Sequence, residues 1–143
     1  MANAQTRTRG VNQLLGTVLG AVYVAVGLLG FTITSGIGFA ATRGDKLLGL
    51  FMVNPLHNIV HLAVGVLLFV AARGGERVAA GANTLVGGVY LLVGVIGLFI
   101  LNSSANILAL NAADNVLHFG SAIALLVAGL TRRPQTARVS DAL

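Results

Sequence analysis

The sequence contains no cysteine and no tryptophan, and only 9% of its 143 residues are charged. Without cysteine, disulfides, thiolate metal ligands and cysteine nucleophiles are excluded. A soluble globular domain carries about 25% charged residues, so this chain has too little polar surface to cover a fold exposed to water. Since 56% of the residues are hydrophobic, the composition indicates an integral membrane protein whose main partner is the lipid bilayer.

The few charged residues occur in small groups that leave long uncharged stretches between them. Stretches of 33, 26 and 36 residues without a charge follow Arg9, Lys46 and Arg77. Each stretch exceeds the roughly 20 residues that a transmembrane helix needs. The nine bases are not gathered on one solvated face, as nucleic-acid binding would require, so no nucleic-acid partner is expected.

Four apolar segments predict an all-α membrane protein with a four-transmembrane-helix bundle. They cover residues 11–31, 55–72, 85–101 and 112–130. Because these runs are continuous and do not alternate between polar and apolar residues, they favour helices over the strands of a barrel. We expect a single domain over residues 1–131, followed by a polar, disordered tail over 132–143.

The distribution of basic residues predicts the orientation of the four helices. Both termini and the 73–77 loop fall on one side of the membrane, and this side carries seven of the nine bases. These seven are Arg7, Arg9, Arg73, Arg77, Arg132, Arg133 and Arg138. The other side carries only Arg43 and Lys46. The positive-inside rule therefore predicts a multi-pass protein of the plasma membrane with both termini in the cytoplasm.

Two connections lie on the opposite, outer side. Residues 32–53 are expected to form a long glycine-containing loop. Its apolar end, 47–52 (LLGLFM), is expected either to lie in the membrane interface or to fold back against the bundle. The second connection, 102–106, is short and uncharged.

One segment of the chain recurs. Residues 54–62 (NPLHNIVHL) align without gaps on residues 111–119 (NAADNVLHF), so that two Asn and one His occupy the same three places and His57 is matched by Asp114. Polar residues are rare in membrane helices, and such a match is therefore hard to obtain from composition alone. The motif indicates an internal duplication.

A second, weaker match extends the repeat upstream. Residues 23–31 (YVAVGLLGF) align on residues 90–98 (YLLVGVIGL), sharing Tyr, Val and two Gly, although glycine-rich apolar helices also align by composition. Together the matches predict two tandem helical hairpins, over 11–72 and 85–130. Because each hairpin has an even number of spans, we expect them to be related by a pseudo-twofold axis along the membrane normal.

The repeated motif contains all three histidines and the only acid within a predicted span. His57 and His61 are four residues apart, as are Asp114 and His118, so each pair lies on one helix face about 6 Å apart. We expect this candidate ligand set in the outer leaflet, roughly 10 Å from the helix starts. Residues expected to cap these helices or to contact the set are Asn54, Asn58, Asn111, Asn115, Tyr23 and Tyr90.

Three interpretations of the polar set remain open. In the first, it binds a metal ion, a haem held by His61 and His118, or the polar head of a quinone-like molecule. In the second, Asp114 accepts hydrogen bonds from His57 or His61, and the set is a clamp between helices. In the third, the acid and the histidines relay protons or line a path for a small solute.

Among these interpretations we favour a small, non-enzymatic ligand-binding or accessory protein. No phosphate-binding loop, nucleophile elbow or pair of carboxylates is present, and no catalytic residue is predicted. The alternative is a structural subunit of a larger membrane complex, so that other membrane subunits or further copies of the chain are candidate partners. A proton relay or transporter is the third candidate.

Residues 50–62 (LFMVNPLHNIVHL) and 111–119 resemble the two signature segments of the small four-helix membrane proteins grouped as domain of unknown function 4383, which are common in actinobacteria. The resemblance covers about residues 11–130, and it implies four spans and no established activity. Its signature residues fall here on Asn54, Pro55, His57, Asn58, His61, Asp114, Asn115 and His118. A looser similarity to four-helix proteins of the DoxX kind concerns architecture only and transfers no function.

Overall fold

The computed structural model describes residues 10–131, so the predicted tail over 132–143 lies outside the described residues. The described part is built from helices and one short antiparallel hairpin of strands. In chain order the elements are α1 (Val11–Phe31), β1 (Asp45–Leu47), β2 (Phe51–Val53), α2 (Pro55–Arg73), α3 (Glu76–Ile100) and α4 (Ala112–Leu130).

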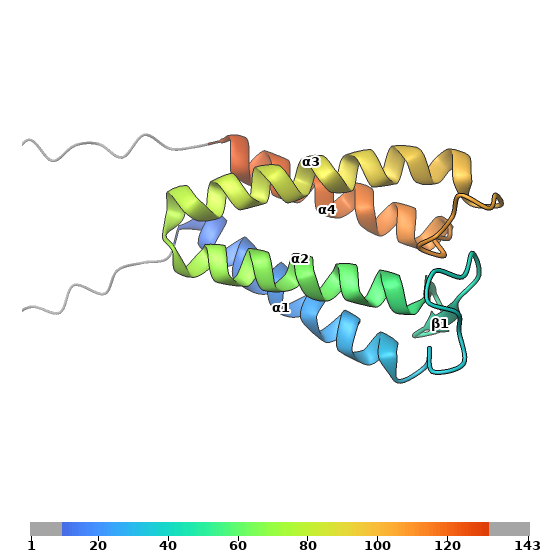
Figure 1. Ribbon diagram of the computed structural model, residues 1–143. Coiled ribbons are helices and arrows are strands. Elements are labelled where there is room, and N and C mark those ends of the chain that lie inside the picture. Colours follow the sequence, from blue (N-terminus) through green and yellow to red (C-terminus); the bar gives the residue numbers. More distant parts are fainter. Residues whose placement is uncertain (1–9, 132–143) are drawn as a thin grey trace, which may run out of the picture.

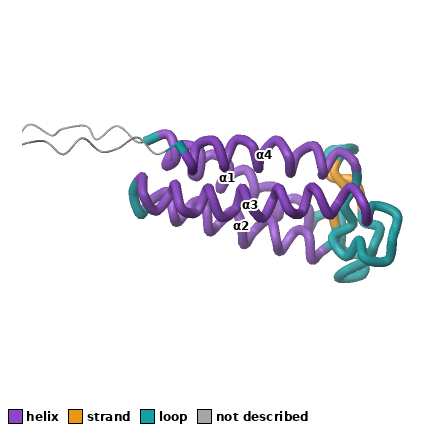
Figure 2. The backbone as a smooth tube through the Cα atoms, turned by 90° about the horizontal axis from the view of Figure 1, so that it is seen from above, coloured by secondary structure: helices purple, strands orange, loops and turns teal. Residues whose placement is uncertain are grey.

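The helices run side by side as two antiparallel pairs (Figure 1). Helix α1 packs mainly on α2, and α3 packs mainly on α4. The start of α1, the α2–α3 connection and the end of α4 lie together, and we call this the connection end. The strands and the α3–α4 connection lie together at the opposite end (Figure 2), which we call the hairpin end.

Small residues allow α1 and α2 to approach closely. A Cβ atom placed on Gly20 would lie 2.8 Å from the carbonyl oxygen of Gly65, and one placed on Gly65 would lie 2.8 Å from the carbonyl oxygen of Gly20. These distances are too short for any side chain, so the two backbones are in direct contact. Gly16, one turn before Gly20, is buried on the same face. Such small-residue contacts are typical of helices that pack in membranes.

The distribution of polar and apolar side chains is the reverse of that in a soluble protein. Each of the four helices is long and apolar enough to cross a membrane. Large apolar side chains such as Leu14, Val66 and Phe99 are exposed, whereas His57 and Asn58 are buried. Because exposed apolar surface is unfavourable in water, this arrangement fits a hydrocarbon surrounding.

The predicted helix boundaries are confirmed for three helices and wrong for the third one in the chain. Helices α1 and α4 have the predicted bounds, and α2 ends one residue later, at Arg73. Helix α3 begins at Glu76 rather than at Leu85. Residues 76–84 (ERVAAGANT) are mostly small or polar, so their apolar character does not indicate a helix, yet several of them are buried against neighbouring helices.

The expected 32–53 loop contains an antiparallel hairpin in which Leu47 pairs with Phe51 and Asp45 with Val53. Leu47 and Val53 are buried, and the turn at Leu48 and Leu50 is exposed. The strands therefore fold back against the bundle, while the turn between them presents apolar side chains outward. The strands are only three residues long, too short to give an alternating pattern in the sequence.

Candidate functional site

Two asparagines start the helices that carry the histidines. The Oδ1 atom of Asn54 accepts a hydrogen bond from the backbone N–H of His57 at 2.8 Å, and Pro55 follows as the first helical residue. The Oδ1 atom of Asn111 accepts from the backbone N–H of Asp114 at 3.0 Å, and the Asp114 carboxylate accepts in return from the N–H of Asn111 at 2.8 Å. Asn54 is thus the N-cap of α2 and Asn111 that of α4, the second as a reciprocal capping box.

The same two asparagines also bind across the molecule. The Nδ2 atom of Asn54 donates to the carbonyl oxygens of Ala41 and Ile107, each at 2.8 Å. The Nδ2 atom of Asn111 donates to the carbonyl oxygen of Leu50, also at 2.8 Å. Each cap therefore holds the connection that belongs to the other helical pair. These bonds fix the starts of α2 and α4 relative to one another.

The three histidines come together between these helix starts. His57 and His61 project from α2 and His118 projects from α4, and one nitrogen of each lies within 4.8 Å of the other two. Their exposed fractions are 1%, 2% and 3%. The ring centroids of His57 and His61 are 4.4 Å apart, and those of His57 and His118 are 6.1 Å apart. We call these three residues the histidine cluster.

Most nitrogens of the histidine cluster have no hydrogen-bond partner within residues 10–131. The Nδ1 atom of His57 lies 3.2 Å from the carbonyl oxygen of Met52. If this contact is a hydrogen bond, Nδ1 donates it, and the lone pair is then on Nε2, because a carbonyl oxygen can only accept. This Nε2, both nitrogens of His61 and the Nδ1 of His118 are buried without a partner. Each such atom costs about 1–3 kcal/mol unless something satisfies it.

The structure places Asp114 beside the histidine cluster and gives it backbone partners. Its Oδ2 atom accepts from the N–H of Met52 at 3.2 Å, in addition to the N–H of Asn111. The expected hydrogen bond from His57 or His61 to this carboxylate is not made. Over the described residues, the group of side chains close enough to share an ion is formed by the histidines alone, without a carboxylate. Asp114 thus caps α4 and holds the β2 backbone.

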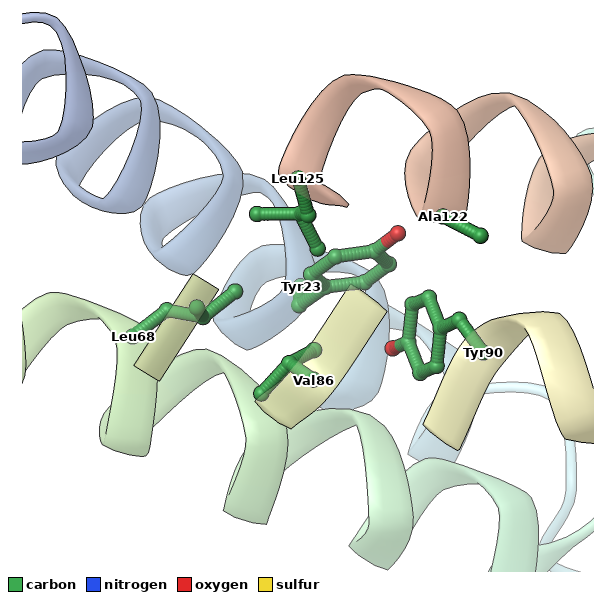
Figure 3. Close-up of a cluster of buried hydrophobic side chains, with 6 residues drawn as sticks. All are labelled: Tyr23, Leu68, Val86, Tyr90, Ala122 and Leu125. Atoms are coloured by element: carbon green, nitrogen blue, oxygen red, sulfur yellow. The ribbon is translucent and has the colours of Figure 1, made fainter. Parts of the chain in front are cut away.

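Two tyrosines close the side of the cluster that faces the connection end. The ring of Tyr23 stacks on His61 with centroids 5.4 Å apart, and the ring of Tyr90 lies 5.1 Å from that of His118. The two tyrosine rings meet edge to face at 5.3 Å (Figure 3). The Tyr23 hydroxyl donates to Oγ of Ser121 at 2.5 Å. Leu68, Val86, Ala122 and Leu125 complete this buried layer.

Asn58 and Asn115, the remaining two predicted residues, pack against glycines. A Cβ atom on Gly30 would overlap the amide group of Asn58, and one on Gly97 would overlap the amide group of Asn115. The Nδ2 atom of Asn58 donates to Oγ1 of Thr34 at 3.1 Å. The side-chain oxygen of Asn58 and both polar atoms of Asn115 have no partner in the described part of the chain. Asn58 and Asn115, which align in the repeat, thus make matching contacts.

Sequence reasoning missed Met52, Ser121 and Thr34. Met52 acts through its backbone N–H and carbonyl groups, for which a sequence carries no signal. Ser121 and Thr34 are buried polar residues, and their hydroxyl groups in apolar surroundings were the available signal. Such side chains in a membrane protein are expected to hydrogen-bond between helices.

A family model described as "Domain of unknown function (DUF4383)" matches residues 13–131 of the chain. The match confirms the resemblance drawn from the two signature segments. No curated protein and no solved structure matches the chain. The chemistry of the site must therefore be read from its own atoms.

Proposed function

The chain belongs to the DUF4383 family of unknown function, and we propose that it is a membrane protein that binds one transition-metal ion at His57, His61 and His118. The observation that carries this proposal is the set of four buried imidazole nitrogens without hydrogen-bond partners. Buried polar atoms are almost always satisfied. An ion that binds one nitrogen of each histidine would use at most three of these four atoms, because the second nitrogen of His61 carries the proton. Imidazole is a common ligand of Zn, Cu, Fe and Ni.

The distances in the histidine cluster suit a single ion. The donor nitrogens lie within 4.8 Å of one another, whereas nitrogens bound to one ion at about 2.0–2.1 Å are about 3.4 Å apart. Binding one ion would therefore require the imidazole rings to rotate toward one another. In addition, a hydrogen bond from Nδ1 of His57 to Met52 would hold the second ring nitrogen as it is usually held in a metal-bound histidine.

The geometry favours an ion over the larger ligands considered from the sequence. A haem between His61 and His118 would need room for its macrocycle around the iron. That space is occupied by the ring of His57, 4.4 Å from His61, and by the stacked ring of Tyr23, 5.4 Å from His61. A quinone head would require the same rings to separate. An ion displaces none of them.

The clamp interpretation applies to other residues of the motif. Asn54, Asn111 and Asp114 make the hydrogen bonds that join the two helical pairs. The histidines add only one bond to this network, from His57 to Met52. The polar set therefore divides into a structural group and a group with free lone pairs.

In this proposal the four helices cross the plasma membrane, and both termini lie in the cytoplasm. The exposed apolar side chains support insertion, and the seven bases on one side support the orientation. The hairpin end, with the histidine cluster, would then face the outer leaflet. A pseudo-twofold axis between the two helical pairs is supported by the matching contacts of Asn58 with Gly30 and of Asn115 with Gly97.

Metal analysis of the purified protein tests the proposal. Bound metal is removed from the full chain in mild detergent with a chelator, and the protein is then incubated with Zn(II), Cu(I) or Ni(II). After removal of excess ion, the metal content is measured by elemental mass spectrometry. We expect one ion per chain for at least one metal, loss of that ion in His57→Ala, His61→Ala and His118→Ala, and no Soret band. Asn83→Ala is the matched control, because Asn83 is a fully buried polar residue of α3 that binds Asn12 and not the cluster.

A folded wild-type protein that retains less than stoichiometric amounts of every ion would overturn the proposal. A Soret band or an extractable quinone would replace it with one of the other ligands. Equal retention in the wild type and in all three histidine variants would place the ion elsewhere.

A further inference from the structure

The histidine cluster offers an ion three ligands of zero charge. A neutral imidazole binds metal through its lone pair and contributes no negative charge. Within the described ranges, no aspartate or glutamate joins the group that shares the ion. The site therefore leaves the charge of the ion uncompensated by its direct ligands.

The buried surroundings of the cluster make the charge of a bound ion energetically unfavourable. The three side chains are at most 3% exposed, and transferring an ion into such an interior carries a penalty that grows with the square of the charge. His57 also lies in the first turn of α2, where the helix dipole is positive. Both effects favour a monovalent ion over a divalent one.

One negative charge lies close by. Asp114 is the only acid within the four helices apart from Glu76, which is at the connection end, and the backbone of Met52 links it to His57. A single carboxylate balances an ion of charge +1 and leaves an ion of charge +2 with an excess. The local charges thus match a monovalent ion.

The number of ligands leads to the same conclusion. Zn(II) in proteins takes four ligands, the fourth being water in open sites. Here three nitrogens converge, and the tyrosine layer and the loops at the hairpin end cover them. Cu(I), a monovalent closed-shell ion that readily accepts two or three ligands, is satisfied by three imidazoles.

We infer that the histidine cluster is a three-coordinate site for monovalent copper, Cu(I). The inference rests on the metal-binding function proposed above and specifies its ion. It involves binding alone, with no change of oxidation state at the site.

Competition titrations under anaerobic, reducing conditions test the inference on the full chain in detergent. Cu(I), Ag(I) and Zn(II) are each titrated against a chromophoric chelator of known affinity. All three ions have a filled d shell, so ligand-field effects do not contribute to the differences. We expect Cu(I) and Ag(I) to bind one per chain and at least about a hundredfold more tightly than Zn(II). X-ray absorption at the copper edge should report three nitrogen ligands.

A matched pair of variants isolates the effect of charge. His118→Glu and His118→Gln have the same length and differ only in the added carboxylate. We expect the ratio of Zn(II) affinity to Cu(I) affinity to be at least about tenfold higher in His118→Glu than in His118→Gln. If the variants do not fold, the wild-type titration and absorption spectrum decide the question alone.

The outcomes separate this inference from the proposed function. Zn(II) binding at His57, His61 and His118 as tightly as Cu(I), or a four-coordinate copper site, would overturn the inference and keep the metal-binding function. Failure of all three ions to bind would overturn both.

Discussion

The carbonyl oxygen of Met52 lies 3.2 Å from the Nδ1 atom of His57. Met52 belongs to β2, and its backbone N–H is held by the Asp114 carboxylate. A residue of the hairpin therefore joins the capping acid of α4 to a histidine of α2. This connection gives Asp114 a positioning role for the histidine cluster, in place of the ligand role that its spacing from His118 indicated.

Asp114→Asn should weaken the bond to Met52 and loosen the orientation of His57. We expect metal affinity to fall by about tenfold, as for other residues that orient a ligand, while the capacity stays at one ion per chain. Affinity and capacity are read from the same chelator titration. Asp45→Asn, an exposed acid on the same hairpin, should leave both unchanged. Loss of the capacity in Asp114→Asn would identify Asp114 as a ligand.

Gly65→Ala should force α1 and α2 apart, because the added Cβ would lie 2.6 Å from the backbone nitrogen of Val24 and 2.8 Å from the carbonyl oxygen of Gly20. We expect a loss of about 1–3 kcal/mol in the free energy of unfolding, measured by thermal unfolding in detergent. Gly120→Ala in α4 is the control, since a Cβ there meets no atom within 4 Å. Equal stabilities of the two variants would contradict the close packing.

Glu76→Gln should destabilise the start of α1. The Glu76 carboxylate accepts from the backbone N–H groups of Asn12 and Gln13 at 3.1 and 3.2 Å, where a negative charge also interacts favourably with the helix dipole. We expect a lower melting temperature and unchanged metal affinity, because Glu76 lies at the connection end. Arg77→Gln, next to it and exposed, should change neither quantity. A weaker metal affinity in Glu76→Gln would mean that the two ends of the bundle are coupled.

The absence of cysteine makes single reporter cysteines straightforward to interpret. In the proposed orientation, a membrane-impermeant thiol reagent should label Ser104→Cys in intact cells and Gly74→Cys only after lysis. Both positions are exposed, at the hairpin end and the connection end respectively. Labelling by mass shift on a gel gives the result. The reverse pattern would invert the orientation, and labelling of both in intact cells would contradict insertion.

The sequence predicted those parts of the fold that depend on side-chain type. The apolar runs placed α1 and α4, and the repeated motif put all three histidines into one candidate set, and these three lie together in the structure. The start of α3 was missed because residues 76–84 are small and polar, and their helical packing depends on neighbours that a local pattern does not contain.

The sequence predicted which residues form the site better than it predicted how their side chains are arranged. Four residues at helical spacing formed the candidate set, but spacing cannot distinguish a carboxylate facing its own helix start from one facing the neighbouring histidines. For Asp114 the decision depends on the backbone of Met52, 62 residues earlier in the chain. Contacts made by backbone groups over such separations leave no trace in residue types.

The histidine cluster contains two residues of α2 and one of α4, so it involves both helical pairs. A bound ion would then act as a reversible cross-link between the two halves of the chain. Any ligand that binds only the folded state stabilises it, by about 2.7 kcal/mol when its concentration is a hundred times the dissociation constant. The stability of the assembled bundle would thereby depend on the supply of metal, and without the ion the two halves would be held by the asparagine caps and the apolar layer alone.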